Sequence, residues 1–317
     1  MHNKASANQL ANANLLNLIK RLIEKNTNFK EEFSMSELLL EERKDLLTKK
    51  STEARKLVVQ TVHHAGAGHI GGPMSAIDVL TNLYFNEMNI STEDPNGEDR
   101  DRFVLSKGHS AIGLYPVLAL RGYFPIEELK TFDAINSRLQ AHPDMTILPG
   151  LDMSTGSLGQ GISAAVGMAL GAKLQNKNFR TYCMIGDGES QEGQVWEAAD
   201  VASKYNLDNL VVILDNNKIQ QFGWNAGNQT REIPAFNPKA RWEAFGWYVI
   251  EIDGHHHEAI TNAFNEARNV TGKPTMIIAN TVKGKGVSFM ENTHNWHSRV
   301  PTDEELRQAI QELETEV

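Results

Sequence analysis

A carboxylate and a carboxamide each follow an apolar run of the sequence. Asp187 lies in Gly-Asp-Gly at residues 186–188, directly after the run 181–185, and Asn217 follows the run 209–214. Oxygen atoms of these groups are the hard ligands that Mg²⁺ prefers, and Mg²⁺ in proteins often holds phosphate groups. The glycines beside Asp187 would let the backbone approach a diphosphate closely. The two motifs therefore predict a site for a diphosphate and its magnesium ion.

Two parallel strands joined by one helix would bring Asp187 and Asn217 together. The runs 181–185 and 209–214 are apolar enough to be buried strands, and residues 192–205 between them have the pattern of a helix. A right-handed β-α-β crossover places the carboxyl ends of its strands side by side. Open α/β sheets bind their ligands at these ends. We therefore expect an α/β fold with a doubly wound, mostly parallel sheet flanked by helices.

Each motif alone also has a simpler interpretation. Gly-Asp-Gly is an ordinary turn sequence, and Asn-Asn at 216–217 is common where a strand ends. Their joint placement after two apolar runs favours the binding site, and no GxGxxG or GxxxxGK[ST] sequence lies within residues 181–217 to offer another phosphate loop. The arrangement resembles the thiamine diphosphate motif, in which GDG is followed by NN.

Further motifs resemble those of the transketolase family and occur in the family's order. They extend the resemblance from about Ala54 to about Pro301 and imply the thiamine diphosphate-binding fold. Within that family the chain is similar to the N-terminal, pyrophosphate-binding subunit of a split transketolase. The motifs are Gly-His-Ile-Gly-Gly-Pro at 68–73, Leu-Ser-Lys-Gly-His-Ser at 105–110, Gln-Ala-His-Pro at 140–143, Ser-Thr-Gly-Ser-Leu-Gly-Gln-Gly at 154–161 and Asn-Trp-His at 295–297.

The chain divides into an N-terminal helical extension, residues 1–50, and the pyrophosphate-binding domain, residues 51–317. The extension lies outside the resemblance. Its leucines have helical spacing, which favours a helix packed on the domain or on a partner over a catalytic role. The helices expected in these terminal regions cover residues 15–25, 36–49, a segment from Thr52 to the glycines at 66–68, and a closing segment at 302–317.

The resemblance implies a metal and cofactor site. Asp187, Asn217 and the carbonyl oxygen of Ile219 are similar to the family's protein ligands of Mg²⁺, for which Ca²⁺ or Mn²⁺ can substitute, with diphosphate and water completing an octahedron. Glu192 matches a carboxylate at the family's subunit interface, and its simpler role is a favourable charge at a helix start. The residues implied to contact thiamine diphosphate are Gly72, His109, Gly156, Ser157, Leu158, Gly188, Glu192, Gln221, Lys283 and His297.

Four of the eleven histidines lie in these motifs: His69, His109, His142 and His297. The others are interpreted as surface or packing residues. By the resemblance, His69, His142 and His297 are catalytic and surround the sugar bond that is made or broken, while His109 and His297 contact the diphosphate. Imidazole titrates near neutral pH, so it suits the proton transfers that the movement of a two-carbon ketol unit between sugars requires.

Composition indicates which partners and which location to expect. The formal net charge is −9, and no apolar run approaches the roughly 20 residues that span a bilayer. We therefore expect neither nucleic acid nor a membrane as a partner. The cytoplasm is the expected location, because no secretion signal begins the chain. The one cysteine, Cys183, allows no internal disulfide and is interpreted as a buried, unreactive thiol.

The resemblance also implies a partner. The family's pyrimidine-binding and C-terminal domains have no counterpart here, so a separate subunit is expected to carry them in an α₂β₂ assembly, and only the pair would transfer ketol units. The expected donor is a phosphorylated ketose, with a sulfonated or branched sugar left open. The alternatives are the alpha chain of a 2-oxo-acid dehydrogenase, part of a deoxyxylulose-phosphate synthase, and a non-catalytic cofactor-domain protein. The motifs at 105–110 and 140–143 argue against the dehydrogenase.

Overall fold

The computed structural model of the chain describes residues 35–221 and 237–315. The chain divides into two units, Met1–Arg43 and Lys44–Val317, and the architecture below belongs to the second, except that its first helix begins at Met35. The helix expected at residues 15–25 lies outside the described residues. No helix among the described residues has the length and apolar character needed to cross a bilayer.

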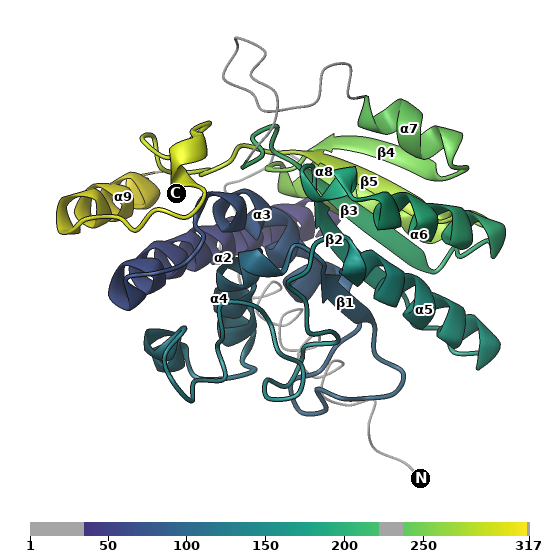
Figure 1. Ribbon diagram of the computed structural model, residues 1–317, viewed down its shortest axis with the longest axis horizontal. Helices are drawn as coiled ribbons and strands as arrows, with labels where there is room; N and C mark the ends of the chain where they lie inside the picture. Colours follow the sequence, from purple (N-terminus) through teal and green to yellow (C-terminus); the bar gives the residue numbers. More distant parts are fainter. Residues whose placement is uncertain (1–34, 222–236, 316–317) are drawn as a thin grey trace. The chain divides into compact units, whose positions relative to one another are not determined.

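Five strands form one sheet in the described part of the second unit. Every neighbouring pair is parallel, so all carboxyl ends lie along one edge (Figure 1). The two strands predicted to carry the metal ligands are neighbours, and the helix predicted between them is confirmed as α6 (Gly193–Lys204). In spatial order the strands are β1 (Arg102–Leu105), β2 (Thr181–Gly186), β3 (Leu210–Asn216), β5 (Thr275–Asn280) and β4 (Tyr248–Asp253).

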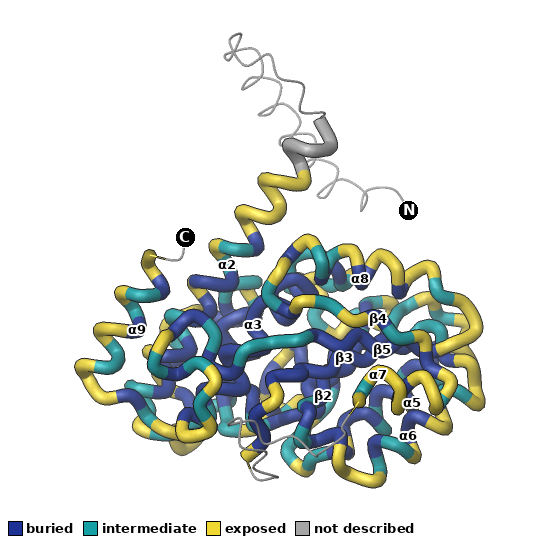
Figure 2. Tube along the Cα trace, turned by 90° about the horizontal axis from the view of Figure 1, so that it is seen from above, coloured by how far each residue is buried: buried dark blue, intermediate teal, exposed yellow. Residues whose placement is uncertain are grey.

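Successive side chains of each central strand enter two different apolar cores. Tyr182 and Met184 of β2 belong to one core, and Cys183 and Ile185 belong to the other. This follows from the strand's two-residue period, and it requires helices on both faces of the sheet. Figure 2 shows the resulting burial along β2, β3 and β5. The expected doubly wound α/β fold is therefore confirmed.

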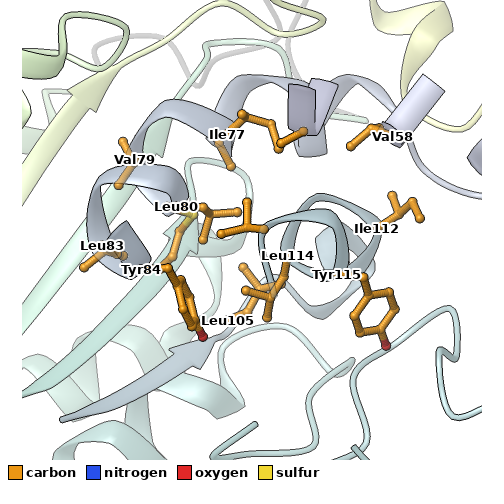
Figure 3. Close-up of a cluster of buried hydrophobic side chains, with 14 of the residues drawn as sticks. Val58, Ile77, Val79, Leu80, Leu83, Tyr84, Leu105, Ile112, Leu114 and Tyr115 are labelled. Carbon is orange, nitrogen blue, oxygen red and sulfur yellow. The ribbon is translucent and has the colours of Figure 1, made fainter. Parts of the chain in front are cut away.

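Helices cover the two faces of the sheet. In Figure 3, Ile77 and Leu80 of the first core lie beside Leu114 from the neighbouring helix. The helices of the first core are α2 (Met35–Ala65), α3 (Gly71–Asn82), α4 (Ala111–Arg121), α8 (His257–Asn269) and α9 (Asp303–Thr315). Those of the second are α5 (Gln160–Leu174), α6 and α7 (Pro238–Ala244). Shorter helical segments lie at Leu83–Glu87, Gly108–Ser110, Ile126–Thr131, Glu189–Gln191 and His294–Trp296.

Two of the helix ends predicted from the sequence are confirmed, and a third is wrong. Gly66 ends α2 with a φ of 65° and donates its N–H to the Val62 carbonyl at 3.1 Å, as its lack of a side chain allows. The closing helix is α9, where the Thr302 hydroxyl accepts the Glu305 N–H at 3.3 Å. The expected break before Thr52 is wrong. Helix α2 runs through it because no glycine or proline interrupts the segment there.

Candidate active site

A cavity of about 470 Å³ opens at the carboxyl ends of the strands, and the predicted residues converge on it. Of all the residues assigned to the site from sequence, Ser157 is the one outside the cavity wall, and it is exposed in the loop between two residues that do line it. The predicted residues that line the cavity are His69, Gly72, His109, His142, Gly156, Leu158, Asp187, Gly188, Glu192, Asn217, Ile219, Gln221, Lys283 and His297.

The carboxylate of Asp187 joins the ends of two adjacent strands. One oxygen accepts the N–H of Gly188 at 2.7 Å, and the other accepts the N–H of Lys218 at 2.7 Å. Lys218 has a φ of 64°, and the chain turns there from β3 toward the cavity. Asn217 lies one residue earlier and its side-chain oxygen accepts the N–H of Ile219 at 3.2 Å. The β-α-β arrangement thus brings the predicted metal ligands to one wall.

These donors fit a small hard cation. Asp187 is buried, and burial together with the nearby carboxylate of Asp215 raises the pKa of its carboxyl to about 6. A divalent cation would favour the ionised form and offset that cost. Among the residues the structure describes, no three His, Cys, Asp or Glu side chains are grouped to hold a metal ion. The candidate site therefore depends on mixed oxygen donors: a carboxylate, an amide and a carbonyl.

Three histidine rings from distant parts of the chain meet in the cavity. The ring centres of His69 and His109 are 5.0 Å apart, those of His69 and His297 are 5.1 Å apart, and those of His109 and His297 are 5.5 Å apart. The N–H of Ile70 donates to the His297 carbonyl at 3.2 Å, which holds the two loops together. His142, the fourth predicted histidine, lines the same cavity. The structure thus brings all four loop histidines together.

The three imidazoles of His69, His109 and His297 are held in their neutral form. Burial lowers the pKa of His109 to about 2, and Lys107 adds to the effect. Burial, followed by the charge of Lys283, lowers the pKa of His297 to about 3. Burial is also the main cause that lowers the pKa of His69, before the neighbouring His142. Neutral rings can both accept and donate protons, whereas protonated rings could only donate.

Lys283 brings a buried positive charge to the wall of the cavity. Its ammonium donates to the carbonyl of Ile219 at 2.8 Å and lies 3.0 Å from Nδ1 of His297. The side chain is buried, so its charge acts in a medium that screens it weakly. The ammonium of Lys107 also lines the cavity, but it pairs with the carboxylate of Asp215. The charge of Lys283 therefore makes this wall suitable for an anion.

The sequence did not single out Lys107 and its partner Asp215. Lys107 donates to the carbonyl of Gly72 at 3.1 Å and forms a buried ion pair with Asp215. Asp215 also accepts the hydroxyl of Ser75 at 2.7 Å. Burial would raise the pKa of Asp215, but Lys107 and the hydrogen bonds lower it overall. The available signal was position, because Lys107 lies inside the motif at 105–110 and Asp215 directly precedes Asn-Asn at 216–217.

Glu189 is a third residue whose role was not predicted. One carboxylate oxygen accepts the hydroxyl of Ser106 at 2.5 Å and the N–H of Gly159 at 2.8 Å, and the other accepts the N–H of Gly186 at 3.0 Å. It therefore links the exit of β1, the start of α5 and the end of β2. Its neighbour Glu192 lies at the start of α6 and lines the cavity. Glu189 holds the loops that shape the cavity.

The remaining expectations concern Gln221 and Cys183. Gln221 is exposed at the rim of the cavity, while the adjacent Gln220 is buried and hydrogen-bonded to Gln191. A side chain at Gly188 would come within 3.3 Å of Gln220, so the glycine gives this glutamine room. Burial raises the pKa of Cys183 well above its ordinary value, which agrees with an unreactive thiol.

Comparison with known proteins places the chain among transketolases. The family described as "Transketolase, thiamine diphosphate binding domain" matches residues 48–316. The 6-deoxy-6-sulfo-D-fructose transketolase subunit of Clostridium sp. (strain MSTE9) is 47% identical over 263 residues, which cover 83% of this chain and 94% of that subunit. An apulose-4-phosphate transketolase subunit from Phocaeicola vulgatus is 41% identical over 270 residues, which cover 85% of this chain and 94% of that protein.

Single-chain transketolases match over a smaller part of their length. Human transketolase is 41% identical over 260 residues, which cover 82% of this chain but 40% of the human protein. The crystal structure of transketolase from Campylobacter jejuni superposes with a TM-score of 0.78 at 33% identity, covering 85% of this chain and 43% of that one. The matched region thus covers nearly all of the separate subunits and less than half of the single-chain enzymes. The chain belongs to the transketolase family and is an N-terminal, thiamine diphosphate-binding subunit of the split type.

Proposed function

We propose that the cavity binds the diphosphate of thiamine diphosphate through Mg²⁺ and serves ketol transfer between sugars. The observation that carries this proposal is the placement of Asp187. Its buried carboxylate joins the ends of β2 and β3, and its raised pKa supports the proposal because a bound cation would offset the cost of burying the ionised form. Asn217 and the carbonyl of Ile219 would be the other protein ligands of Mg²⁺. Ca²⁺ or Mn²⁺ would substitute for Mg²⁺.

The cofactor contacts follow from the same cavity. The diphosphate would lie against Gly188 and the ammonium of Lys283, with His109, His297 and the backbone of Gly72 beside it. The positive wall supports this placement because a diphosphate is strongly anionic. We assign further contacts to the loop residues Gly156, Ser157 and Leu158 and to the rim residues Glu192 and Gln221.

The histidines would manage protons on the sugar. Thiamine diphosphate, when bound, supplies an electron sink for the carbon that carries the ketol unit. His69, His142 and His297 would hydrogen-bond the substrate's hydroxyl oxygens, orient the sugar and move protons at those oxygens. The partial burial of His69 and His297 supports this role, because it lowers their pKa values and neutral rings can accept a hydroxyl proton. General acid-base action of this kind contributes a factor of roughly 10² to 10⁴ in rate.

A second subunit completes the proposal. Two relatives are named as subunits, and the matched region covers 94% of each of them and 83% or 85% of this chain. We propose a partner that carries the pyrimidine-binding and C-terminal domains, in an α₂β₂ assembly located in the cytoplasm. Glu192, exposed at the rim of the cavity, would face that partner.

The proposed donor is a ketose with an anionic group, either phosphate or sulfonate. One relative is named for 6-deoxy-6-sulfo-D-fructose and another for apulose-4-phosphate, so both names specify such a sugar. The group that reads the anion would lie on the partner subunit, because the described cavity residues already serve the diphosphate in this proposal.

Reconstitution tests this function. The purified chain is mixed with the partner subunit, and ketol transfer is measured with a panel of phosphorylated, sulfonated and branched ketoses. We expect transfer only from the pair, and only with thiamine diphosphate and Mg²⁺ present. Robust transfer by the chain alone, or by the pair without the cofactor, would contradict the proposal.

A further inference from the structure

A buried hydrogen-bonded chain runs from helix α3 to the loop that carries Lys283. Nδ1 of His255 lies 2.7 Å from a carboxylate oxygen of Asp78, and its Nε2 accepts the N–H of Val282 at 2.8 Å. His255 follows β4, Asp78 belongs to α3, and Val282 follows β5. The contact therefore joins three elements that are far apart in the sequence. Val282 immediately precedes the lysine of the cavity wall.

The partners of His255 determine which of its nitrogens carries the proton. Val282 can only donate, because its contact is a backbone N–H, so Nε2 must be unprotonated. Nδ1 then carries the proton and donates a hydrogen bond to the carboxylate of Asp78. This carboxylate stays ionised, because Arg55 and His255 outweigh the cost of burial and lower the pKa of Asp78. Asp78 thus orients the ring through Nδ1, and the ring holds the N–H of Val282 through Nε2.

The other groups around Asp78 support the same orientation. Arg55 donates to one carboxylate oxygen at 3.0 Å and to the other at 2.5 Å. His257 lies 3.7 Å from the first of these oxygens and 3.3 Å from the hydroxyl of Ser51. The carboxylate is therefore held by several donors, and its second oxygen remains directed at His255.

The backbone on both sides of Lys283 is held in place. Before Lys283, the N–H of Val282 donates to Nε2 of His255. After it, the N–H of Gly284 donates to the carbonyl of Gly71 at 3.0 Å. Gly284 has a φ of 78°, and a side chain there would come within 2.4 Å of a backbone oxygen. The carbonyl of Lys283 itself accepts an N–H at 2.9 Å. A long flexible side chain is aimed reproducibly only if its backbone is fixed in this way.

We propose that His255, oriented by Asp78, is a positioning residue for Lys283. By fixing the peptide of Val282, it sets the direction in which the Lys283 ammonium enters the cavity, toward the carbonyl of Ile219 and the ring of His297. The inference rests on the proposed function in one respect, which is that the ammonium of Lys283 meets a diphosphate. It assigns a role to a histidine that sequence reasoning treated as a surface or packing residue.

Amide exchange tests the positioning without any ligand. In His255→Phe the ring loses the nitrogen that accepts the Val282 N–H, whereas in His255→Gln a side-chain oxygen can take its place. His256→Phe is the matched control, because that exposed neighbour caps α8 instead. We expect faster hydrogen exchange at Val282 in His255→Phe, slow exchange restored in His255→Gln, and no change at Val282 in the control. Unchanged exchange in His255→Phe would overturn the proposal.

The tautomer offers a spectroscopic test of the same chain of contacts. Nitrogen-15 NMR of the intact protein distinguishes a ring protonated at Nδ1 from one protonated at Nε2. We expect the His255 signal to show a proton on Nδ1 and a bare Nε2, as the contacts require. The opposite tautomer would overturn the proposal, since a protonated Nε2 cannot accept the Val282 N–H.

A double-mutant cycle tests whether His255 acts through Lys283. Binding of thiamine diphosphate with Mg²⁺ to the chain, reconstituted with its partner subunit, is measured by calorimetry for His255→Phe, Lys283→Met and the double variant. We expect His255→Phe to weaken binding about tenfold alone and to have little further effect once Lys283 is replaced.

The outcomes separate this inference from the proposed function. An equal loss in both backgrounds would overturn the inference, because His255 would then act independently of Lys283. Unchanged binding in His255→Phe beside a clear loss in Lys283→Met would overturn it as well. If thiamine diphosphate binds neither the wild type nor any variant, the proposed function fails, and the exchange rate of Val282 still decides the positioning role.

Discussion

The two ends of the sheet each carry a polar cavity, and they differ in how their charges are arranged. The cavity at the carboxyl ends has a volume of about 470 Å³, and the one at the amino ends, lined by Glu87, Asp101 and Arg268 among others, has about 620 Å³. At the amino ends Arg268 pairs with Glu87 at 2.6 Å, and the Tyr182 hydroxyl donates to the same carboxylate at 2.5 Å. Arg268 and Glu87 thus compensate each other there, while burial raises the pKa of Asp101.

The carboxyl ends also contain such an ion pair, Lys107 with Asp215, and beside it they gather imidazoles and a further ammonium. Burial and the charge of Lys283 lower the pKa of His109 and of His297, and the buried carboxyl of Asp187 has a raised pKa. Such an arrangement has a cost in the free chain and suits a cation and an anion supplied together from outside. Size and polarity therefore do not distinguish a binding site here, whereas the convergence of three histidines and a lysine from distant loops does.

The sharpest test removes Asp187. Asp187→Ala should weaken Mg²⁺-dependent binding of thiamine diphosphate by at least about 100-fold, because the site loses its charged oxygen donor. Calorimetry on the reconstituted pair measures the effect. Asp101→Asn is the matched control, since Asp101 is also a buried carboxylate but lies at the amino ends. Equal losses in the two variants would remove the distinction between the cavities.

Replacing Lys283 should have the next largest effect. Lys283→Met keeps much of the side chain's length and removes its charge, so cofactor affinity should fall by about 10- to 100-fold. The same change should raise the pKa of His297, because Lys283 helps to lower it. Binding isotherms and an NMR titration of His297 measure the two results. A pKa that stays low would show that burial alone holds the ring neutral.

A change at the amino ends should affect stability and leave binding intact. Tyr182→Phe removes the hydroxyl that donates to Glu87, which should lower the free energy of unfolding by about 1.5 kcal/mol. Glu87 keeps its pairing with Arg268, so the local structure should persist. Denaturant unfolding measures the loss. A marked fall in cofactor affinity would mean that this cavity communicates with the other.

Acidification should destabilise the free chain through the buried imidazoles. The pKa of His109 is lowered to about 2 from an ordinary value of 6.5, so below pH 6.5 the unfolded chain binds a proton that the folded chain does not. Stability should therefore fall with decreasing pH, by at most about 1.4 kcal/mol per pH unit for this ring. Thermal unfolding between pH 7 and pH 5 would measure the slope. A His109→Gln variant should show a shallower one.

Asp187 should act in the opposite direction. Its pKa is raised from 3.8 to about 6, so between these values the folded chain binds the additional proton and gains stability as the pH falls. Asp187→Asn removes that gain, and stability should then fall more steeply on acidification. An unchanged slope would mean that the carboxylate is already compensated in the free chain.

The local pattern of the sequence was enough to predict the sheet and the convergence of Asp187 and Asn217. The apolar runs became β2 and β3, the segment between them became α6, and Asp187 and Asn217 lie where parallel strands end. These features depend on short-range periodicity and on the position of glycines, so they can be read from neighbouring residues. The motif histidines also converge as expected.

Contacts between distant residues were decided by the tertiary structure. Lys107 forms an ion pair with Asp215, and Glu189 accepts a hydrogen bond from the hydroxyl of Ser106. His255 connects Asp78 with the peptide that precedes Lys283. Each of these polar groups could equally have been solvated, since nothing in its own neighbourhood in the sequence specifies a partner. Packing of the helices on the sheet excludes water from these positions, and a polar group without water must find a partner in the fold.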